Sequence, residues 1–269
     1  MKFSVLISVY NKEKPEYLDL CLNSVIKNQT LKPTQIVLVE DGILTSELYN
    51  VINKWKKHLT IHKLKKNQGL GISLRNGLEK CKYNYIARMD SDDICHKNRF
   101  QKQINFLEKN KKIDILGTSI KEFDNIPNDL KFIRKVPKNH KKIIEFCKYR
   151  SPFNHMTVIF NKEIIKKAGN YNNKFPFLED YYLWYRTIKK GAITANLQEP
   201  LVYARTNNMH QKRKGIKYLR NEIRLKKEMY KNNFINIFEL SINIFARILI
   251  RLLPTTYIKK IYITFLRNK

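Results

Sequence analysis

Residues 3–9 read FSVLISV and residues 35–39 read QIVLV, two short apolar runs that each fit a buried β-strand. Between them, apolar side chains recur at helical spacing, as at Leu18, Leu22 and Val25. Strand, helix and strand in this order predict a βαβ unit with parallel strands. The first run is too short and too β-branched for a signal peptide, so we expect it to be the first core strand.

The same alternation continues along the chain. Strands are predicted near 59–64, 85–89, 113–120 and 153–160, and helices near 69–81, 100–107 and 162–168. This pattern predicts an α/β fold with a Rossmann-like, mostly parallel sheet flanked by helices. In such sheets, ligands bind at the carboxyl ends of the strands.

Two parts are expected, residues 1–215 as the α/β domain and residues 216–269 as a basic, amphipathic helical extension. From residue 235 onward, apolar residues alternate with cations, and Pro254 is expected to divide a helix pair. No uncharged apolar stretch is long enough for a transmembrane span. The extension is predicted to lie on an anionic membrane surface, and the alternative is packing on the domain or on a partner copy.

Composition narrows the class of protein. The 269 residues are 43% hydrophobic, which excludes a disordered chain, and the net charge of +30 attracts polyanions without selecting one. The four cysteines are scattered, with no spacing typical of a zinc site or a disulfide framework, as expected in a reducing cytoplasm.

An acidic cluster follows the strand at 85–89, where residues 88–93 read RMDSDD. Two carboxylates at a strand end can share a divalent cation and leave coordination sites for phosphate oxygens. An oxygen-only ligand set favours Mn²⁺ or Mg²⁺. The alternative is an acidic turn that caps the next helix.

Other polar clusters follow other strands. Tyr10 and Asn11 come after the first strand, and Glu40, Asp41 and Gly42 come after the second. We expect these groups to meet the acidic cluster at one edge of the sheet.

Together these motifs resemble the inverting family 2 glycosyltransferases, which have the glycosyltransferase A fold and use nucleotide-diphosphate sugars. The resemblance covers residues 1–215 and most resembles bacterial enzymes that add a hexose to a lipid-linked sugar in O-antigen or exopolysaccharide assembly. Its carriers are residues 4–11 (SVLISVYN), 39–42 (VEDG), 67–71 (NQGLG) with 75–76 (RN), 90–93 (DSDD) and 177–181 (FLEDY).

The resemblance implies a UDP-sugar donor. Asp41 would accept a hydrogen bond from uracil N3–H, and Tyr10 would flank the base. Asp93 would orient a sugar, and a basic segment that includes Arg205 and Arg213 would close over the diphosphate. The predicted nucleotide-sugar-binding residues are Tyr10, Asn11, Glu40, Asp41, Asn67, Arg75, Asp90, Asp93 and Arg213.

The resemblance also implies the metal ligands and the base. Asp92 is expected to bind the cation, with Asp90 and His210 as further ligands. Asp180 would remove the proton of the acceptor hydroxyl, and Glu179 would position sugar hydroxyls or tune the base. The alternative for this acidic pair is a helix N-cap, and a helix N-terminus would also keep Asp180 ionised.

These roles imply transfer of galactose or glucose, with formation of a β-linkage, to a sugar on undecaprenyl diphosphate, expected to be GlcNAc. The enzyme would be peripheral on the cytoplasmic face of the inner membrane. A sugar-nucleotide pyrophosphorylase is the competing enzyme class, but no Gly-rich loop follows the first strand. A basic nucleic-acid or membrane-binding module is the non-enzyme alternative. Its carboxylates would repel phosphate, so no specific nucleic acid is expected.

Overall fold

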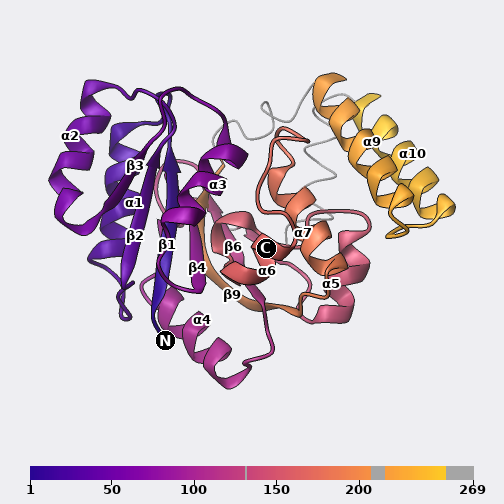
Figure 1. The fold of residues 1–269 in the computed structure, drawn as a ribbon, viewed down its shortest axis with the longest axis horizontal. Helices are drawn as coiled ribbons and strands as arrows, with labels where there is room; N and C mark the ends of the chain where they lie inside the picture. The colour runs from indigo at the N-terminus through magenta and orange to yellow at the C-terminus, as the bar shows by residue number, and fades with distance from the viewer. Residues whose placement is uncertain (131, 207–215, 253–269) are drawn as a thin grey trace.

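The computed structural model describes residues 1–130, 132–206 and 216–252 (Figure 1). One sheet runs through the α/β domain in the order β3-β2-β1-β4-β8-β6-β9-β5, and β7 pairs with β6 at the side. The strands are β1 (Phe3–Val9), β2 (Gln35–Glu40), β3 (Thr60–Lys63), β4 (Tyr85–Asp90), β5 (Ile94–Cys95), β6 (Ile115–Phe123), β7 (Ile133–Arg134), β8 (Ile159–Asn161) and β9 (Thr194–Arg205).

The half of the sheet from β3 to β4 is parallel, as the βαβ pattern predicts. Beyond it, β8 is antiparallel to both β4 and β6, and β6 and β9 are parallel to each other. The predicted α/β fold with flanking helices is therefore confirmed.

Helices cover both faces of the sheet (Figure 1). Along β1, Leu6 packs in one apolar cluster while Val5 and Ile7 pack in the other, because successive side chains of a strand point to opposite faces. The helices are α1 (Pro15–Ile26), α2 (Ser46–Trp55), α3 (Leu70–Lys80), α4 (Arg99–Lys109), α5 (His140–Cys147), α6 (Lys162–Lys167), α7 (Glu179–Lys189), α9 (Ile216–Lys231) and α10 (Ile237–Leu252), with short 3-10 turns at Lys56–His58 and His155–Thr157.

The longest strand, β9, has no counterpart among the predicted elements. Pro200 and the polar residues before it interrupt the apolar pattern of the strand. The pairing of β6 with β9 shifts register around Ser119 and Pro200, and such an irregularity is where a strand tolerates proline.

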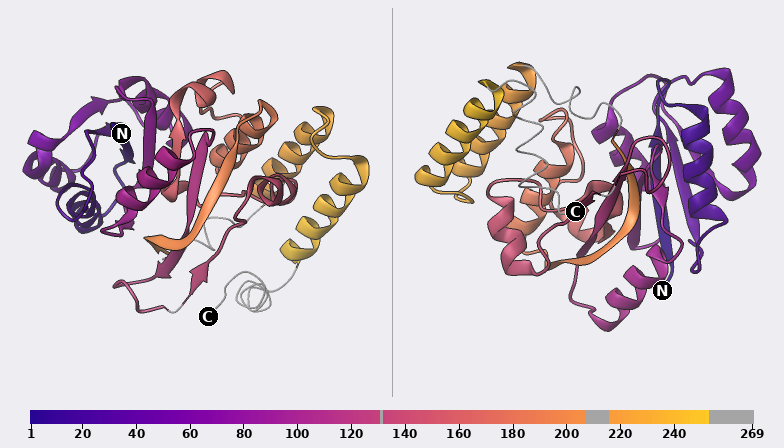
Figure 2. Two further views of the ribbon diagram at one scale, coloured as in Figure 1. Left: turned by 90° about the horizontal axis from the view of Figure 1, so that it is seen from below. Right: turned by 180° about the vertical axis from the view of Figure 1, so that it is seen from behind.

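The C-terminal helices α9 and α10 lie side by side at the edge of the molecule farthest from α2 (Figures 1 and 2). Leu225 of α9 and Leu240 of α10 join the core cluster that also contains Trp184 of α7. Helix α10 is described up to Leu252, and Pro254 and the expected second half of the helix pair lie outside the described residues. None of the helices in the described parts of the chain combines the length and the apolar composition needed to cross a bilayer.

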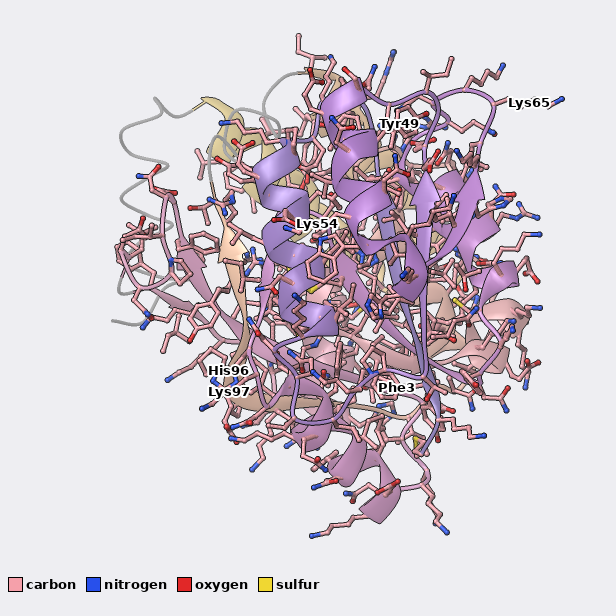
Figure 3. All side chains as sticks on the ribbon, turned by 90° about the vertical axis from the view of Figure 1, so that its left-hand side faces the viewer. Phe3, Tyr49, Lys54, Lys65, His96 and Lys97 are labelled. Carbon is pink, nitrogen blue, oxygen red and sulfur yellow. The ribbon has the colours of Figure 1, made fainter. Side chains whose placement is uncertain are left out.

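Positive charge is spread over the α/β domain. Lys54 of α2 and Lys65 of the loop after β3 lie on the same side of the molecule but on separate elements, and nitrogen atoms are scattered around them (Figure 3). On this side the charge follows no single helix.

Candidate active site

The parallel strands end at a common level. Val9 of β1 pairs with Glu40 of β2, and Ser8 pairs with Asp90 of β4, so the loops after these strands begin side by side. The sequence places its polar clusters in these loops, and the sheet therefore brings them to one edge.

The acidic cluster is compact. Carboxylate oxygens of Asp90, Asp92 and Asp93 lie within 4.8 Å of one another. Burial raises the pKa of Asp92 to about 7, and the charges of Asp90 and Glu13 add to the shift. Burial also raises the pKa of Asp93, and the charges of Asp92 and Asp90 add to the shift. The cluster thus carries more negative charge than its surroundings compensate.

The chemistry of this cluster fits a divalent cation. All three side chains offer oxygen, the donor that Mg²⁺ and Mn²⁺ prefer. Within the described residues, the buried Oδ2 of Asp93 has no hydrogen-bond partner. A cation here would neutralise the repulsion between the carboxylates.

Arg88 is a buried cation next to the acidic cluster. It is 1% exposed and forms an ion pair with Asp90. Burial alone would lower the pKa of Arg88, but the charges of Asp90, Tyr171 and Asp93 outweigh that effect and raise it. Arg88 is therefore a permanent cation in the interior, and it sets the position of Asp90.

Arg205 fixes the other side of the cluster from β9. Its backbone N–H donates to Asp93 Oδ1 at 2.8 Å, and its side-chain Nε donates to the carbonyl of Asp92 at 3.1 Å. The guanidinium lies 3.7 Å from the ring centroid of Tyr17. The expectation that Arg205 belongs to a segment that closes over the diphosphate is wrong, because the side chain is 7% exposed and bonded inside the domain.

The contact of Asp93 with a sugar stays a prediction. The residue is 2% exposed, and its Oδ1 accepts from the backbone N–H of Arg205 on the neighbouring strand. Its place in the structure is within the carboxylate cluster.

Asp41 closes the loop after β2. Its Oδ1 accepts from the N–H of Gln68 at 2.8 Å, and its Oδ2 accepts from the N–H of Gly69 at 3.0 Å. Gly42 has φ +89°, and a Cβ at this position would lie 2.5 Å from the backbone nitrogen of Asn67. The loops after β2 and β3 are thereby packed together, with free lone pairs remaining on Asp41.

Glu40 is the most buried of the predicted nucleotide-site residues, at 1% exposed. Burial raises its pKa, while Lys63, with Nζ 3.5 Å from Oε2, opposes the shift. Its Oε1 is buried and has no hydrogen-bond partner among the described residues, and its predicted role at the nucleotide site stays a prediction. Among the other residues predicted here, Tyr10 is partly buried, whereas Asn11, Asn67 and Arg75 are exposed.

Glu179 and Asp180 form the first turn of α7. Both are partly buried, and the hydroxyl of Ser151 donates to Asp180 Oδ2 at 3.2 Å. Burial raises the pKa of Glu179, and the charge of Asp180 adds to this effect. The free N–H groups of a helix N-terminus favour the ionised form of carboxylates placed there.

The start of α3 contacts the start of α7 through Gly71. A Cβ on Gly71 would lie 2.6 Å from Asn173 Oδ1 and 3.0 Å from Glu179 Cγ. Asn173 in turn donates to the carbonyl of Gln68 at 2.8 Å. The loop that Asp41 holds is therefore in contact with the acidic pair of α7.

Tyr171 connects the acidic pair to the acidic cluster. Burial raises the pKa of Tyr171, the Arg88 cation opposes the shift, and the charges of Asp180 and Asp90 both add to it, so the phenol lies within electrostatic range of the two groups. Its hydroxyl forms a 2.9 Å hydrogen bond with His155 Nε2. Burial lowers the pKa of His155, and Arg88 adds to this effect, so this imidazole is neutral near pH 7.

His210 and Arg213 lie outside the described residues. Arg88, Tyr171 and Ser151 are not among the site residues predicted from the sequence. For Arg88 a signal was present, since a lone arginine interrupts the apolar strand at 85–89. The contacts of Tyr171, Ser151 and Arg205 join residues distant in the sequence, which no local pattern reports.

The model of the family "Glycosyl transferase family 2" matches residues 4–169. A UDP-Gal:alpha-D-GlcNAc-diphosphoundecaprenol beta-1,3-galactosyltransferase of Escherichia coli is 40% identical over 264 residues, which cover 97% of this chain and 95% of that protein. The amylovoran biosynthesis glycosyltransferase AmsE of Erwinia amylovora is 39% identical, with 97% of each chain covered.

Among solved structures, S. aureus TarS 1–349 in complex with UDP-GlcNAc superposes with a TM-score of 0.69 at 19% identity, covering 99% of this chain and 74% of that one. This likeness concerns the fold, and it agrees with the glycosyltransferase A fold that the sequence predicts.

The nucleotide-sugar fold and its acidic edge define a glycosyltransferase. The chain belongs to glycosyltransferase family 2. This membership decides against the pyrophosphorylase alternative and against the non-enzymatic binding module.

Proposed function

We propose that this enzyme transfers a hexose, galactose or glucose, from a UDP-sugar to a GlcNAc residue on a polyprenyl-diphosphate carrier in the synthesis of a surface polysaccharide. The Escherichia coli relative is named as a galactosyltransferase from UDP-Gal to GlcNAc-diphosphoundecaprenol, and AmsE is named for the biosynthesis of amylovoran. The observation that carries the proposal is that Asp90, of the carboxylate cluster after β4, and Asp180, of the acidic pair of α7, both act electrostatically on the same buried phenol, Tyr171.

The donor would bind at the carboxyl edge of β1, β2 and β4. Asp41 would accept the N3–H of uracil with its remaining lone pairs, in a loop that the amides of Gln68 and Gly69 hold rigid. Tyr10 would flank the base, and Asn67 and Arg75 would contribute from the exposed rim.

Asp92 and Asp90 would hold a divalent cation, Mn²⁺ or Mg²⁺, with Asp93 completing the carboxylate set. When bound, the cation supplies positive charge that offsets the charge developing on the departing UDP. Arg88 and Arg205 keep the carboxylates in position from below and from β9.

Asp180 would act as general base on the acceptor hydroxyl. Ser151 donates a hydrogen bond to its carboxylate, and a place in the first turn of a helix favours negative charge. Attack from the side opposite the leaving UDP inverts the anomeric centre, so an α-linked donor gives a β-linked product.

The test is transfer with a panel of UDP-sugars, Mn²⁺ and a synthetic GlcNAc-diphosphate-lipid, followed by mass spectrometry. We expect a product heavier by one hexose, dependent on metal, and at least about 100-fold slower formation with Asp180→Asn. Asp19→Asn is the matched control, because Asp19 pairs with Lys54 on the surface. Tight UDP binding without transfer would redirect the search to another acceptor, and near-normal turnover by Asp180→Asn would remove Asp180 from this role.

A further inference from the structure

The outward face of α10 is apolar. Two phenylalanines dominate it, with Phe238 71% and Phe245 69% exposed. Each turn of the helix adds further exposed apolar side chains, and up to residue 249 these are Ile237, Phe238, Ile242, Phe245, Ile248 and Leu249. These positions fall on one side of an α-helix, since they recur three or four residues apart.

This face also has no unsatisfied side-chain polar group among its described residues. Its polar member, Ser241, donates its hydroxyl to the carbonyl of Ile237 at 3.0 Å. A surface of this kind can enter an apolar phase without leaving a hydrogen-bond donor unpaired.

The inward face of α10 is fastened to the catalytic domain by polar contacts. Glu239 pairs with Lys148 at 2.9 Å, and Arg247 donates to the carbonyl of Tyr149 at 2.7 Å. Asn243 is 1% exposed and donates to the carbonyl of Lys148. The helix is thus held in one orientation, with its apolar side facing outward.

We propose that the outward face of α10 inserts into the headgroup boundary of an anionic lipid bilayer. The positive charge of this part of the chain favours an anionic bilayer over a second copy of the protein. Residues 216–269 contain twelve Lys or Arg against three Glu, in a chain of net charge +30. A second copy would bring like charge against this surface, whereas anionic lipid attracts it.

The inserted helix also orients the active site. Helix α10 contacts Lys148 and Tyr149, and Ser151, two residues further along the chain, bonds to Asp180. Lys226 of α9 donates to the carbonyl of Lys148 as well, at 2.7 Å. The bilayer surface and the proposed base therefore belong to one connected unit, which brings Asp180 toward a sugar held at the membrane by its lipid. This second step depends on the proposed function.

The experiment compares the full chain with Phe238→Ser/Phe245→Ser in co-sedimentation with vesicles of phosphatidylglycerol or phosphatidylcholine. We expect the wild type to bind the anionic vesicles, and the double variant to bind at least about tenfold more weakly. The control is Leu20→Ser/Ile126→Ser, which removes two exposed apolar side chains elsewhere, and it should bind like the wild type.

Vesicle binding equal to that of the wild type in the Phe variant would overturn the proposal. So would a wild-type dimer, without lipid, that the Phe variant converts to monomer in light scattering, because the occupant would then be a second copy. The vesicle-binding measurement does not involve sugar transfer. Its result can therefore be interpreted even if the proposed donor or acceptor is wrong. With a short, water-soluble acceptor the Phe variant should keep wild-type turnover, while turnover on vesicle-embedded acceptor should fall with binding.

Discussion

At the residue scale, the predicted site consists of three carboxylates that lie close together and are held in place by neighbouring residues. Burial and the charge of Asp90 raise the pKa of Asp92 and of Asp93, and Arg88 and Arg205 hold the cluster in place. A site built this way binds protons and cations in competition.

This competition predicts a pH dependence of metal binding. The pKa of Asp92 is raised to about 7 in the folded protein, so without metal its contribution to stability is present at low pH and is lost as pH rises from about 4 to about 7. Mn²⁺ requires the ionised form, and it should therefore raise Tm more at about pH 8 than at about pH 5.5. Thermal unfolding with Mn²⁺ or EDTA at both pH values measures this, and equal metal-induced shifts would contradict it.

The cation ligands are tested separately by Asp92→Asn. We expect at least about a 100-fold loss of turnover and weaker Mn²⁺ binding in calorimetry. Tm in EDTA should stay the same or rise, because the substitution removes a repelling carboxylate. Unchanged Mn²⁺ affinity would show that the metal binds elsewhere.

Gly42 offers a test of the loop beside the predicted uracil site. Gly42→Ala should lower the free energy of unfolding by at least about 2 kcal/mol, since positive φ and a clash with the backbone of Asn67 combine. Gly191→Ala is the control, with φ +88° and nothing within 4 Å. Urea denaturation compares the two, and equal losses would mean that the loop yields to the added methyl group.

At the scale of elements, the contact between α3 and α7 joins the predicted nucleotide side to the predicted base. Gly71 permits this contact, since a Cβ there would meet Asn173 and Glu179. Gly77, on the same helix, instead faces the core side chains of Leu6 and Val39.

The two glycines predict different losses. Gly71→Ala should reduce kcat about tenfold or more by shifting α7, with a small change in Tm. Gly77→Ala should lower Tm through overpacking, and its folded fraction should keep the wild-type affinity for UDP. Steady-state kinetics and UDP calorimetry separate the two, and a stability loss without a kinetic effect in Gly71→Ala would argue against the coupling.

At the scale of the whole molecule, the proposed ligands bind across loops from several strands and should stabilise the fold as a unit. UDP at about 100 times its Kd should add about 2.7 kcal/mol to the free energy of unfolding in Mn²⁺. The same UDP in EDTA should add much less. An equal shift in EDTA would mean that the carboxylate cluster takes no part in nucleotide binding.

The sequence by itself determined the fold class and the composition of the site edge. Apolar periodicity predicts β1, β2, β4 and α3, and the polar residues that follow those strands fall on one edge because parallel strands end together. These signals are local, so a single sequence carries them.

The contacts that hold the site together are visible only in the three-dimensional structure. The polar residues of β9 gave no strand pattern, and its pairing with β5 and β6 brings Arg205 to Asp93, 112 residues away in the chain. The periodicity of α10 likewise indicates an amphipathic helix without saying which face is covered. Packing against α9 and residues 148–149 leaves Phe238 and Phe245 outside, because burial is settled by partners that lie far off in sequence.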